Sequence, residues 1–268
     1  MKLYAIIGYP VKHSFSPLMQ NAWFKEKNID ALYLPFETHP CNLEKTMEAF
    51  KTLGFCGINV TVPHKTAVMK YLDGADNAAK SIGSVNAVSV KNGKMFGSNT
   101  DYSGFLDDLA SKKIKVSGKK AFVFGAGGAA RGVLYALKQA KADTIWLSNR
   151  SFDNAKKLAK EFAVKAVNAN ETPDLLPYAD LIVNASACGM KKDDVLPFEP
   201  APLKKNAAVY DLIYNKKTPF AGLARKNGAK YYSGEGMLIN QGARAFKTWT
   251  GKYPDVKTAA ALFRKFAK

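Results

Sequence analysis

A glycine-rich turn between an apolar run and a helix-forming run constrains the fold of this chain most strongly. Residues 120–131 read KAFVFGAGGAAR, in which four apolar residues end at Gly125 and helix-forming residues follow from Ala129. The spacing of Gly125, Gly127 and Ala130 fits G-x-G-x-x-G/A, where glycines allow a tight turn and a close approach to a pyrophosphate. The amino end of the following helix suits phosphate groups. The segment therefore predicts a Rossmann-type domain that binds a dinucleotide.

The next apolar run indicates which dinucleotide is preferred. Residues 144–147 read TIWL and are followed by Ser148, Asn149, Arg150 and Ser151. NAD sites usually carry an acidic residue at this strand end, whereas a guanidinium suits the 2′-phosphate of NADP. Arg150 therefore predicts NADP(H). The alternative is that Arg150 is only a solvated cation at a strand end.

Alternating strand and helix patterns along the chain predict α/β architecture with parallel sheets. The expected strands span residues 3–8, 32–36, 57–62, 85–90, 94–96, 121–124, 144–147, 181–184, 207–212 and 230–232. The expected helices span residues 16–27, 43–53, 101–111, 152–162, 219–226, 236–249 and 256–267, with two more beginning near His64 and at Ala129. We expect an N-terminal substrate-binding domain over 1–101, onto which the helices of 236–268 pack back, and an NADP-binding domain over 102–235.

Composition narrows the class of protein. The 268 residues are 47% hydrophobic and 23% charged, as in soluble globular proteins. The sequence shows neither a membrane-spanning apolar run nor a signal segment at its start. The three cysteines and three histidines lack the spacing of zinc or disulfide frameworks, so we expect no metal and a cytoplasmic protein.

The net charge of +18 leaves two interpretations, nucleic-acid binding and a lysine-rich solvated surface. The lysines are scattered through every segment, which favours the second interpretation. We therefore expect a small-molecule substrate, no nucleic-acid or membrane partner, and a monomer or homodimer.

Two hydroxyls occupy the loop after the first expected strand. Residues 8–17 read GYPVKHSFSP and lead into a helix, with Ser16 as the expected N-cap and Pro17 at the first helical position. Helix capping alone accounts for Ser16 but not for Ser14. Together the two hydroxyls predict a site for a carboxylate.

Further polar residues stand where other strands end. Asn59 and Thr61 alternate along one strand and should share a face, and Lys65 should lie in the first turn of the next helix. Such groups need partners when buried, and a polyhydroxylated ligand offers them; a surface turn is the alternative. Asn86 and Asp101 flank an expected hairpin. Asp101 alone could be a helix cap, but paired with Lys65 it would form a proton-transfer centre.

Taken together, these motifs strongly resemble the shikimate dehydrogenase family over nearly the whole chain. The motifs, in family order, are GYPVKHSFSP from 8, NVTVPHK from 59, GSVNA from 83, SNTD from 98, GAGGAAR from 125, NRS from 149, NASACGM from 184, VYDLIYNKKTPF from 209 and GEGMLINQGARAF from 234. The resemblance implies reversible hydride transfer between NADPH and the C3 carbonyl of 3-dehydroshikimate, in aromatic amino-acid biosynthesis.

The resemblance also implies residue roles. Lys65 would be the acid/base residue with Asp101 as its partner. The residues implied for substrate binding are Ser14, Ser16, Asn59, Thr61, Lys65, Asn86, Asp101, Tyr214 and Gln241. Those implied for the cofactor are Gly125, Ala126, Gly127, Gly128, Ala129, Asn149, Arg150, Ser151, Ser186, Gly234 and Met237.

One departure concerns the cofactor: Asn154 stands where relatives often carry a second arginine, and Lys156 or Lys157 is the candidate replacement. The alternatives left open are an enzyme that also accepts quinate or NAD, a non-catalytic ligand-binding relative, and an RNA-binding protein. The Lys65 and Asp101 pair argues against a pure binder. The ordered polar motifs have no use in an RNA-binding protein.

Overall fold

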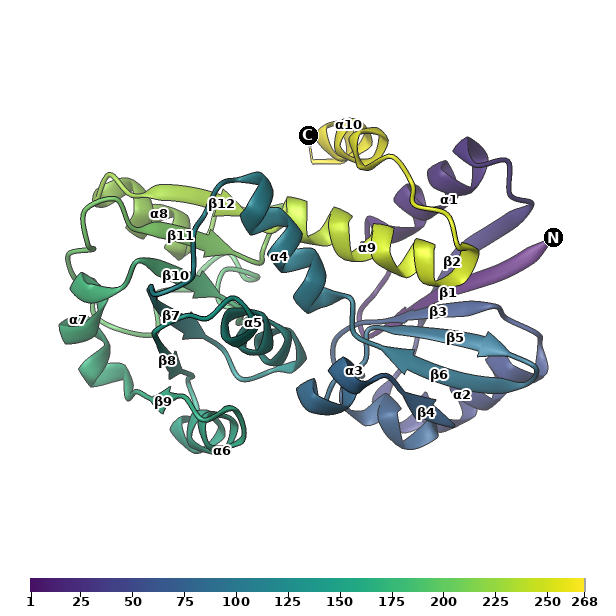
Figure 1. The fold of residues 1–268 in the computed structure, drawn as a ribbon, viewed down its shortest axis with the longest axis horizontal. Helices are drawn as coiled ribbons and strands as arrows, with labels where there is room; N and C mark the ends of the chain where they lie inside the picture. The colour runs from purple at the N-terminus through teal and green to yellow at the C-terminus, as the bar shows by residue number, and fades with distance from the viewer. Residues whose placement is uncertain (268) are drawn as a thin grey trace. The chain divides into compact units, whose positions relative to one another are not determined.

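The computed structural model describes residues 1–267 and divides into two compact units (Figure 1). Unit 1 contains Met1–Gly104 and the chain from Leu238 onward, and unit 2 contains Phe105–Met237. The chain passes from one unit to the other inside two helices, α4 (Asp101–Ser111) and α9 (Glu235–Thr250).

Unit 1 is built on a six-stranded sheet of order β2-β1-β3-β5-β6-β4. The strands are β1 (Lys2–Gly8), β2 (Ala31–Glu37), β3 (Gly57–Val60), β4 (Gly74–Ala75), β5 (Ala87–Lys91) and β6 (Lys94–Ser98). β1 pairs in parallel with β2 and β3, whereas β5 is antiparallel to both β3 and β6. The carboxyl ends of β1, β2, β3 and β6 and the amino end of β5 therefore meet at one edge.

Helices cover both faces of this sheet (Figure 1). They are α1 (Ser16–Glu26), α2 (Leu43–Thr52), α3 (Asn77–Ile82) and α10 (Val256–Phe266), with the 3-10 turns η1 (Pro40–Asn42) and η2 (Ala67–Tyr71). Ala5 and Ile7 of β1 join a buried cluster with Met47 and Phe50 of α2. The alternate residue, Tyr4, points to the opposite face, where rings from α1 and α9 pack on it.

Unit 2 contains a wholly parallel sheet of order β12-β11-β10-β7-β8-β9. The strands are β7 (Lys120–Phe124), β8 (Thr144–Ser148), β9 (Lys165–Ala166), β10 (Leu181–Asn184), β11 (Ala208–Asp211) and β12 (Lys230–Ser233). The helices are α5 (Gly128–Gln139), α6 (Phe152–Phe162), α7 (Thr172–Leu175) and α8 (Pro219–Lys226), with the 3-10 turns η3 (Ala169–Glu171) and η4 (Leu176–Tyr178). The strand order reverses between β7 and β10, which is the point where open α/β sheets bind ligands.

The α/β prediction is confirmed, with two local corrections. The sheet of unit 1 is mixed, because the predicted hairpin adds antiparallel strands to it. The helix expected from His64 is only the short turn η2, and Lys65 lies before it. The Lys65 carbonyl accepts the amide of Val85 across the sheet edge instead of a helical hydrogen bond.

The start of α1 also differs from the prediction. The helix begins at Ser16, so the N-cap is Phe15 and Pro17 takes the second helical position. Ser14 Oγ accepts the Ser16 amide at 3.2 Å, so the capping role belongs to Ser14. Both serines are therefore part of one helix start.

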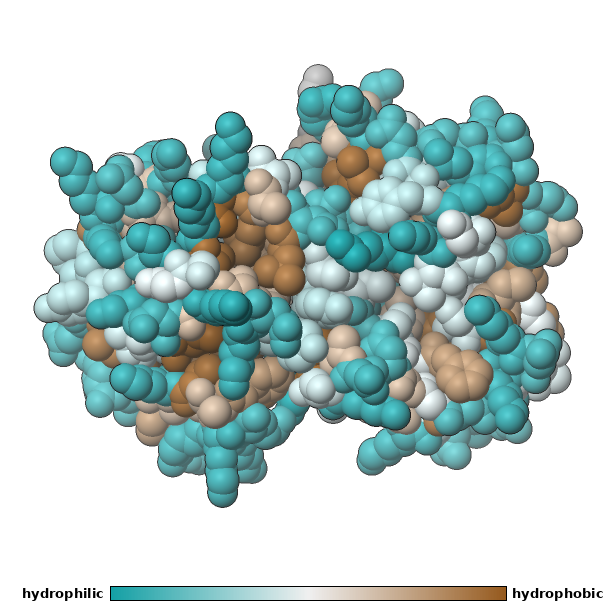
Figure 2. Space-filling view, in the orientation of Figure 1, coloured by the Kyte–Doolittle hydropathy of each residue, from teal (hydrophilic) through white to brown (hydrophobic). Residues whose placement is uncertain are grey.

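The surface agrees with the scattered lysines of the sequence. Hydrophilic side chains are spread over the visible face of each unit (Figure 2). Across residues 1–267, none of the helices combines the length and apolar character needed to span a bilayer.

Candidate active site

An ion pair stands at the edge of the unit 1 sheet where the strand ends meet. Lys65 follows β3 and Asp101 opens α4, and Lys65 Nζ lies 2.6 Å from Asp101 Oδ2. The two side chains are only 13% and 5% exposed. A shielded ammonium beside a carboxylate can deliver a proton and remain held in place, as a general acid requires.

Asn86 organises the residues around this pair. Its Nδ2 lies within 2.9 Å of Asp101 Oδ1, 2.9 Å of Thr100 Oγ1 and 3.0 Å of Gln241 Oε1. Its Oδ1 accepts the amide of Thr100 at 2.6 Å. The hydrogen bond to Oδ1 fixes the direction of the Asp101 carboxylate, so that Oδ2 faces Lys65.

Gln241 reaches this cluster from α9 because that helix packs closely on α4. A Cβ at Gly104 would lie 2.5 Å from the backbone nitrogen of Gln241, so only glycine fits there. Gln241 Nε2 donates to the Leu238 carbonyl at 2.8 Å, which turns Oε1 toward Asn86. The C-terminal part of the chain therefore contributes a polar group to the unit 1 site.

The other predicted substrate residues of unit 1 lie along the same edge. Asn59 is buried at the end of β3 and donates from Nδ2 to the Asn86 carbonyl at 3.0 Å. Thr61 lies just beyond the strand, and its methyl group occupies the space that a Cβ at Gly8 would fill. Ser16 is buried at the start of α1. The loops after β1 and β3 thus present their polar groups together.

The glycine turn of unit 2 has the geometry of a phosphate site. Gly125 adopts φ +114°, and a Cβ there would lie 2.6 Å from the carbonyl oxygen of Ala185. Gly127 is the N-cap of α5 and has no side chain to cap it, and nothing lies within 4 Å of the position its Cβ would take. The open helix start at the β7–β10 switch point therefore fits a pyrophosphate.

The strand end after β8 carries the expected cation. Arg150 is exposed, and Asn149 Nδ2 donates to the Ser151 carbonyl at 3.0 Å, which holds the short turn before α6. Of the two candidate lysines on α6, Lys156 pairs with Asp153 at 2.8 Å.

Ser186 follows β10 beside the glycine turn and is held by buried polar groups. Its Oγ donates to Asn184 Oδ1 at 2.6 Å, and Asn184 Nδ2 donates to Asp211 Oδ1 at 2.9 Å. Burial raises the pKa of Asp211, although Thr218, Ile213 and Asn184 donate hydrogen bonds to the carboxylate. The two loops after β10 and β11 are therefore fixed to each other.

The remaining predicted residues of unit 2 lie on the strands and loops that follow. Tyr214 follows β11, and burial raises the pKa of its hydroxyl. Gly234 separates β12 from α9, where a Cβ would overlap the Leu212 carbonyl, and Met237 is buried in the first turn of α9. These three residues belong to the same unit as the glycine turn.

One residue of the unit 1 cluster was missed by the sequence analysis. Tyr33, at the centre of β2, donates from its hydroxyl to Asn59 Oδ1 at 2.7 Å and is fully buried. A tyrosine inside a buried strand needs a partner for its hydroxyl, which is the signal that could have identified it.

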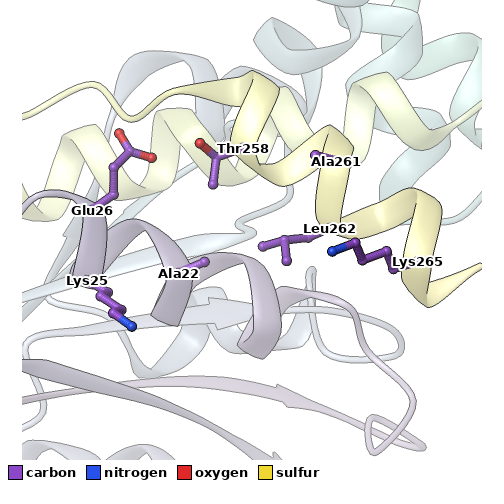
Figure 3. Close-up of a pocket in the computed structure, with 7 residues that line it drawn as sticks. All are labelled: Ala22, Lys25, Glu26, Thr258, Ala261, Leu262 and Lys265. Atoms are coloured by element: carbon purple, nitrogen blue, oxygen red, sulfur yellow. The ribbon is translucent and has the colours of Figure 1, made fainter.

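A separate groove lies between α1 and α10. Its lining residues are Ala22, Lys25, Glu26, Thr258, Ala261, Leu262 and Lys265 (Figure 3). None of them belongs to the clusters described above.

The parallel sheet with its glycine turn, together with the shielded Lys65–Asp101 pair, defines a dinucleotide-dependent oxidoreductase. Comparison with known proteins specifies the class further. Family models match at residues 6–88 (shikimate dehydrogenase substrate binding domain), 108–192 (shikimate / quinate 5-dehydrogenase) and 234–261 (shikimate 5′-dehydrogenase C-terminal domain).

Individual relatives agree along nearly the whole chain. The NADP⁺-dependent shikimate dehydrogenase of Aquifex aeolicus is 44% identical over 250 residues, which are 93% of this chain and 91% of the relative. A crystal structure of shikimate dehydrogenase from Aquifex aeolicus superposes with a TM-score of 0.93 at 42% identity and covers 98% of each chain. The Thermus thermophilus enzyme in complex with NADP(H) and shikimate gives 0.89 at 34% identity, covering 99% of this chain and all of the other.

The chain belongs to the shikimate dehydrogenase family. The family predicted from the ordered motifs is therefore confirmed. The prediction of NADP as cofactor agrees with the NADP⁺ dependence of these relatives.

Proposed function

We propose that the chain catalyses the reversible, NADPH-dependent reduction of 3-dehydroshikimate to shikimate. The observation that carries the proposal is the shielded ion pair of Lys65 and Asp101, at 2.6 Å, on the sheet edge that gathers hydroxyl and amide side chains. The relatives described above are NADP⁺-dependent shikimate dehydrogenases over the same length of chain.

Lys65 supplies the proton in this reaction. NADPH provides the hydride, so the substrate carbonyl carbon gains two electrons and its oxygen becomes an alkoxide. The ammonium of Lys65 donates a proton to that oxygen, and one proton is taken up from solvent in each turnover. Asp101 holds the ammonium in place, and Asn86 fixes the carboxylate.

The other polar residues of unit 1 orient the substrate. Ser14 and Ser16 bind the carboxylate; both belong to the start of α1, where Ser14 Oγ accepts the Ser16 amide. The ring hydroxyls are bound by the amides and hydroxyls of Asn59, Thr61, Asn86 and Gln241, with Asp101 as a further acceptor. Tyr214 of unit 2 is a further substrate residue that the family resemblance implies. Orientation of this kind removes much of the entropic barrier to hydride transfer.

Unit 2 binds the cofactor. The backbone from Gly125 to Ala129 would hold the pyrophosphate, since the open start of α5 offers amide groups. Asn149, Arg150 and Ser151 would hold the adenosine phosphate, and Ser186, Gly234 and Met237 would stand near the nicotinamide, which supplies or accepts the hydride. Unit 1 is accordingly the substrate-binding domain and unit 2 the NADP-binding domain.

Initial rates with each pairing of shikimate or quinate with NADP⁺ or NAD⁺ test the proposal. We expect rapid turnover with shikimate and NADP⁺. Comparable turnover with quinate or NAD⁺ would indicate the broader quinate/shikimate class. Absence of turnover in all four pairings, from folded protein that binds NADP⁺, would refute the proposal.

A further inference from the structure

Tyr33 is a buried tyrosine whose hydroxyl contacts Asn59, one of the residues proposed to bind the substrate. Its side chain has no exposed surface, and its ring lies 6.2 Å from that of Trp249. Phenylalanine would fill the same volume. The hydroxyl is therefore the distinctive feature, and it donates to Asn59 Oδ1 at 2.7 Å.

The position of Tyr33 is fixed independently of its hydroxyl. Asn21 of α1 binds the backbone of Tyr33 twice, accepting its amide at 2.8 Å and donating to its carbonyl at 2.9 Å. Burial also raises the pKa of the phenol well above its usual value, so the hydroxyl keeps its proton and remains a donor. Tyr33 is thus a rigid hydrogen-bond donor aimed at Asn59.

This contact completes the alignment of the Asn59 amide. Nδ2 donates to the Asn86 carbonyl at 3.0 Å, and Oδ1 accepts from Tyr33. One N–H and one lone pair of the amide remain for a ligand. Without the phenol, Oδ1 loses its donor and the amide is restrained on its nitrogen side only.

The contact extends through Asn59 to the residues around the ion pair. A hydrogen-bonded path runs from the Tyr33 hydroxyl through the Asn59 amide to Asn86, whose side chain donates to Asp101. The path connects the buried phenol with the proposed acid–base pair inside unit 1.

We propose that Tyr33 is a positioning residue that fixes the Asn59 amide, and with it the ring hydroxyls of the substrate. This inference rests on the proposed function, because it assumes that Asn59 binds substrate. Tyr33 itself is buried behind Asn59 and acts through it.

Tyr33→Phe tests the inference, and Tyr4→Phe is its matched control. Tyr4 faces Tyr33 directly in the β1–β2 register, is equally buried, and has its ring 5.2 Å from that of Trp249, but it makes none of the hydrogen bonds of this path. We expect Tyr33→Phe to raise KM for shikimate roughly 5- to 20-fold, with kcat and KM for NADP⁺ nearly unchanged. Tyr4→Phe should leave all three constants unchanged.

Asn59→Ala, alone and combined with Tyr33→Phe, shows whether the effect passes through Asn59. We expect Asn59→Ala to raise KM and the added Tyr33→Phe to change it no further, since coupled residues are non-additive. A normal KM in Tyr33→Phe, or the full Tyr33 effect in the Asn59→Ala background, would overturn the inference alone. A normal KM in Asn59→Ala would instead overturn the placement of Asn59 at the substrate, and the inference with it.

Discussion

Replacing Lys65 by methionine tests the centre of the proposed mechanism. Methionine retains an unbranched apolar side chain but removes the ammonium that lies 2.6 Å from Asp101 Oδ2. Loss of a general acid lowers kcat by roughly 10²–10⁴-fold, which corresponds to about 3–5 kcal/mol of activation free energy. NADP⁺ binding should be unaffected, because the glycine turn belongs to the other unit.

The same substitution should also lower the free energy of unfolding. The Asp101 side chain is 5% exposed, and removing one partner of a buried ion pair costs about 3–5 kcal/mol. We expect the lower end, about 3 kcal/mol, because Asn86 still donates to Asp101 Oδ1. Adding Asp101→Asn should restore most of this stability, since the buried negative charge is gone, but it should not restore kcat.

The assay is the initial rate of NADP⁺ reduction at saturating shikimate, below the unfolding temperature of each variant. Lys70→Met is the control, because it removes an exposed lysine five residues further along the chain. A kcat for Lys65→Met within about threefold of the wild type would refute the general-acid role. If Lys70→Met lowered kcat by the same factor, the loss in Lys65→Met would come from the change in net charge.

Three further predictions concern unit 2. Arg150→Ala should weaken the binding of NADPH about 10- to 100-fold and that of NADH only slightly, as measured by fluorescence titration. Equal losses of affinity would mean that Arg150 does not bind the 2′-phosphate. Gly125→Ala should destabilise the protein by at least about 2 kcal/mol and abolish NADP⁺ binding, because φ is +114° and the new Cβ would overlap the Ala185 carbonyl; a wild-type melting temperature would contradict this. Burial raises the pKa of Asp211, so folding favours its protonated form and this residue's contribution to stability falls as pH rises from the unfolded value of 3.8 through the folded one. Melting curves of Asp211→Asn should lack this part of the pH dependence, and an unchanged profile would exclude Asp211 as its source.

Local patterns were sufficient to predict most of the elements. The strand, glycine turn and helix around Gly125 follow from residues that are adjacent in sequence, as does the hairpin turn at Asn92 and Gly93. Two of the errors occur where distant segments decide the outcome. The two-residue strand β4 exists only because β6 pairs with it. The helix expected from His64 is replaced by a turn, in which the Lys65 carbonyl accepts the amide of Val85.

The same difference between local and distant signals holds for the candidate active site. Opposite charges in neighbouring motifs left the pairing of Lys65 with Asp101 open beside a helix cap, and the family resemblance implied it. The structure brings the two side chains to 2.6 Å. Tyr33 could not be assigned in this way, because it lies inside an apolar strand and its partner Asn59 is 26 residues away. Which buried hydroxyl meets which amide depends on strand register, and no local signal in the sequence specifies it.

The discontinuity of unit 1 has a consequence for the order in which the protein matures on the ribosome. Unit 2 is one continuous segment, Phe105–Met237, and can fold as soon as it has emerged. Unit 1 is synthesised first, but it lacks two contacts until the segment after unit 2 has been made. These are the Trp249 indole that donates to the Val88 carbonyl and the Asp255 carbonyl that accepts from Trp23. Gln241, which completes the polar cluster around Asn86, arrives with the same segment. The part of the chain that is made first is therefore completed last, and the cluster around Asn86 gains Gln241 only after unit 2 has been synthesised.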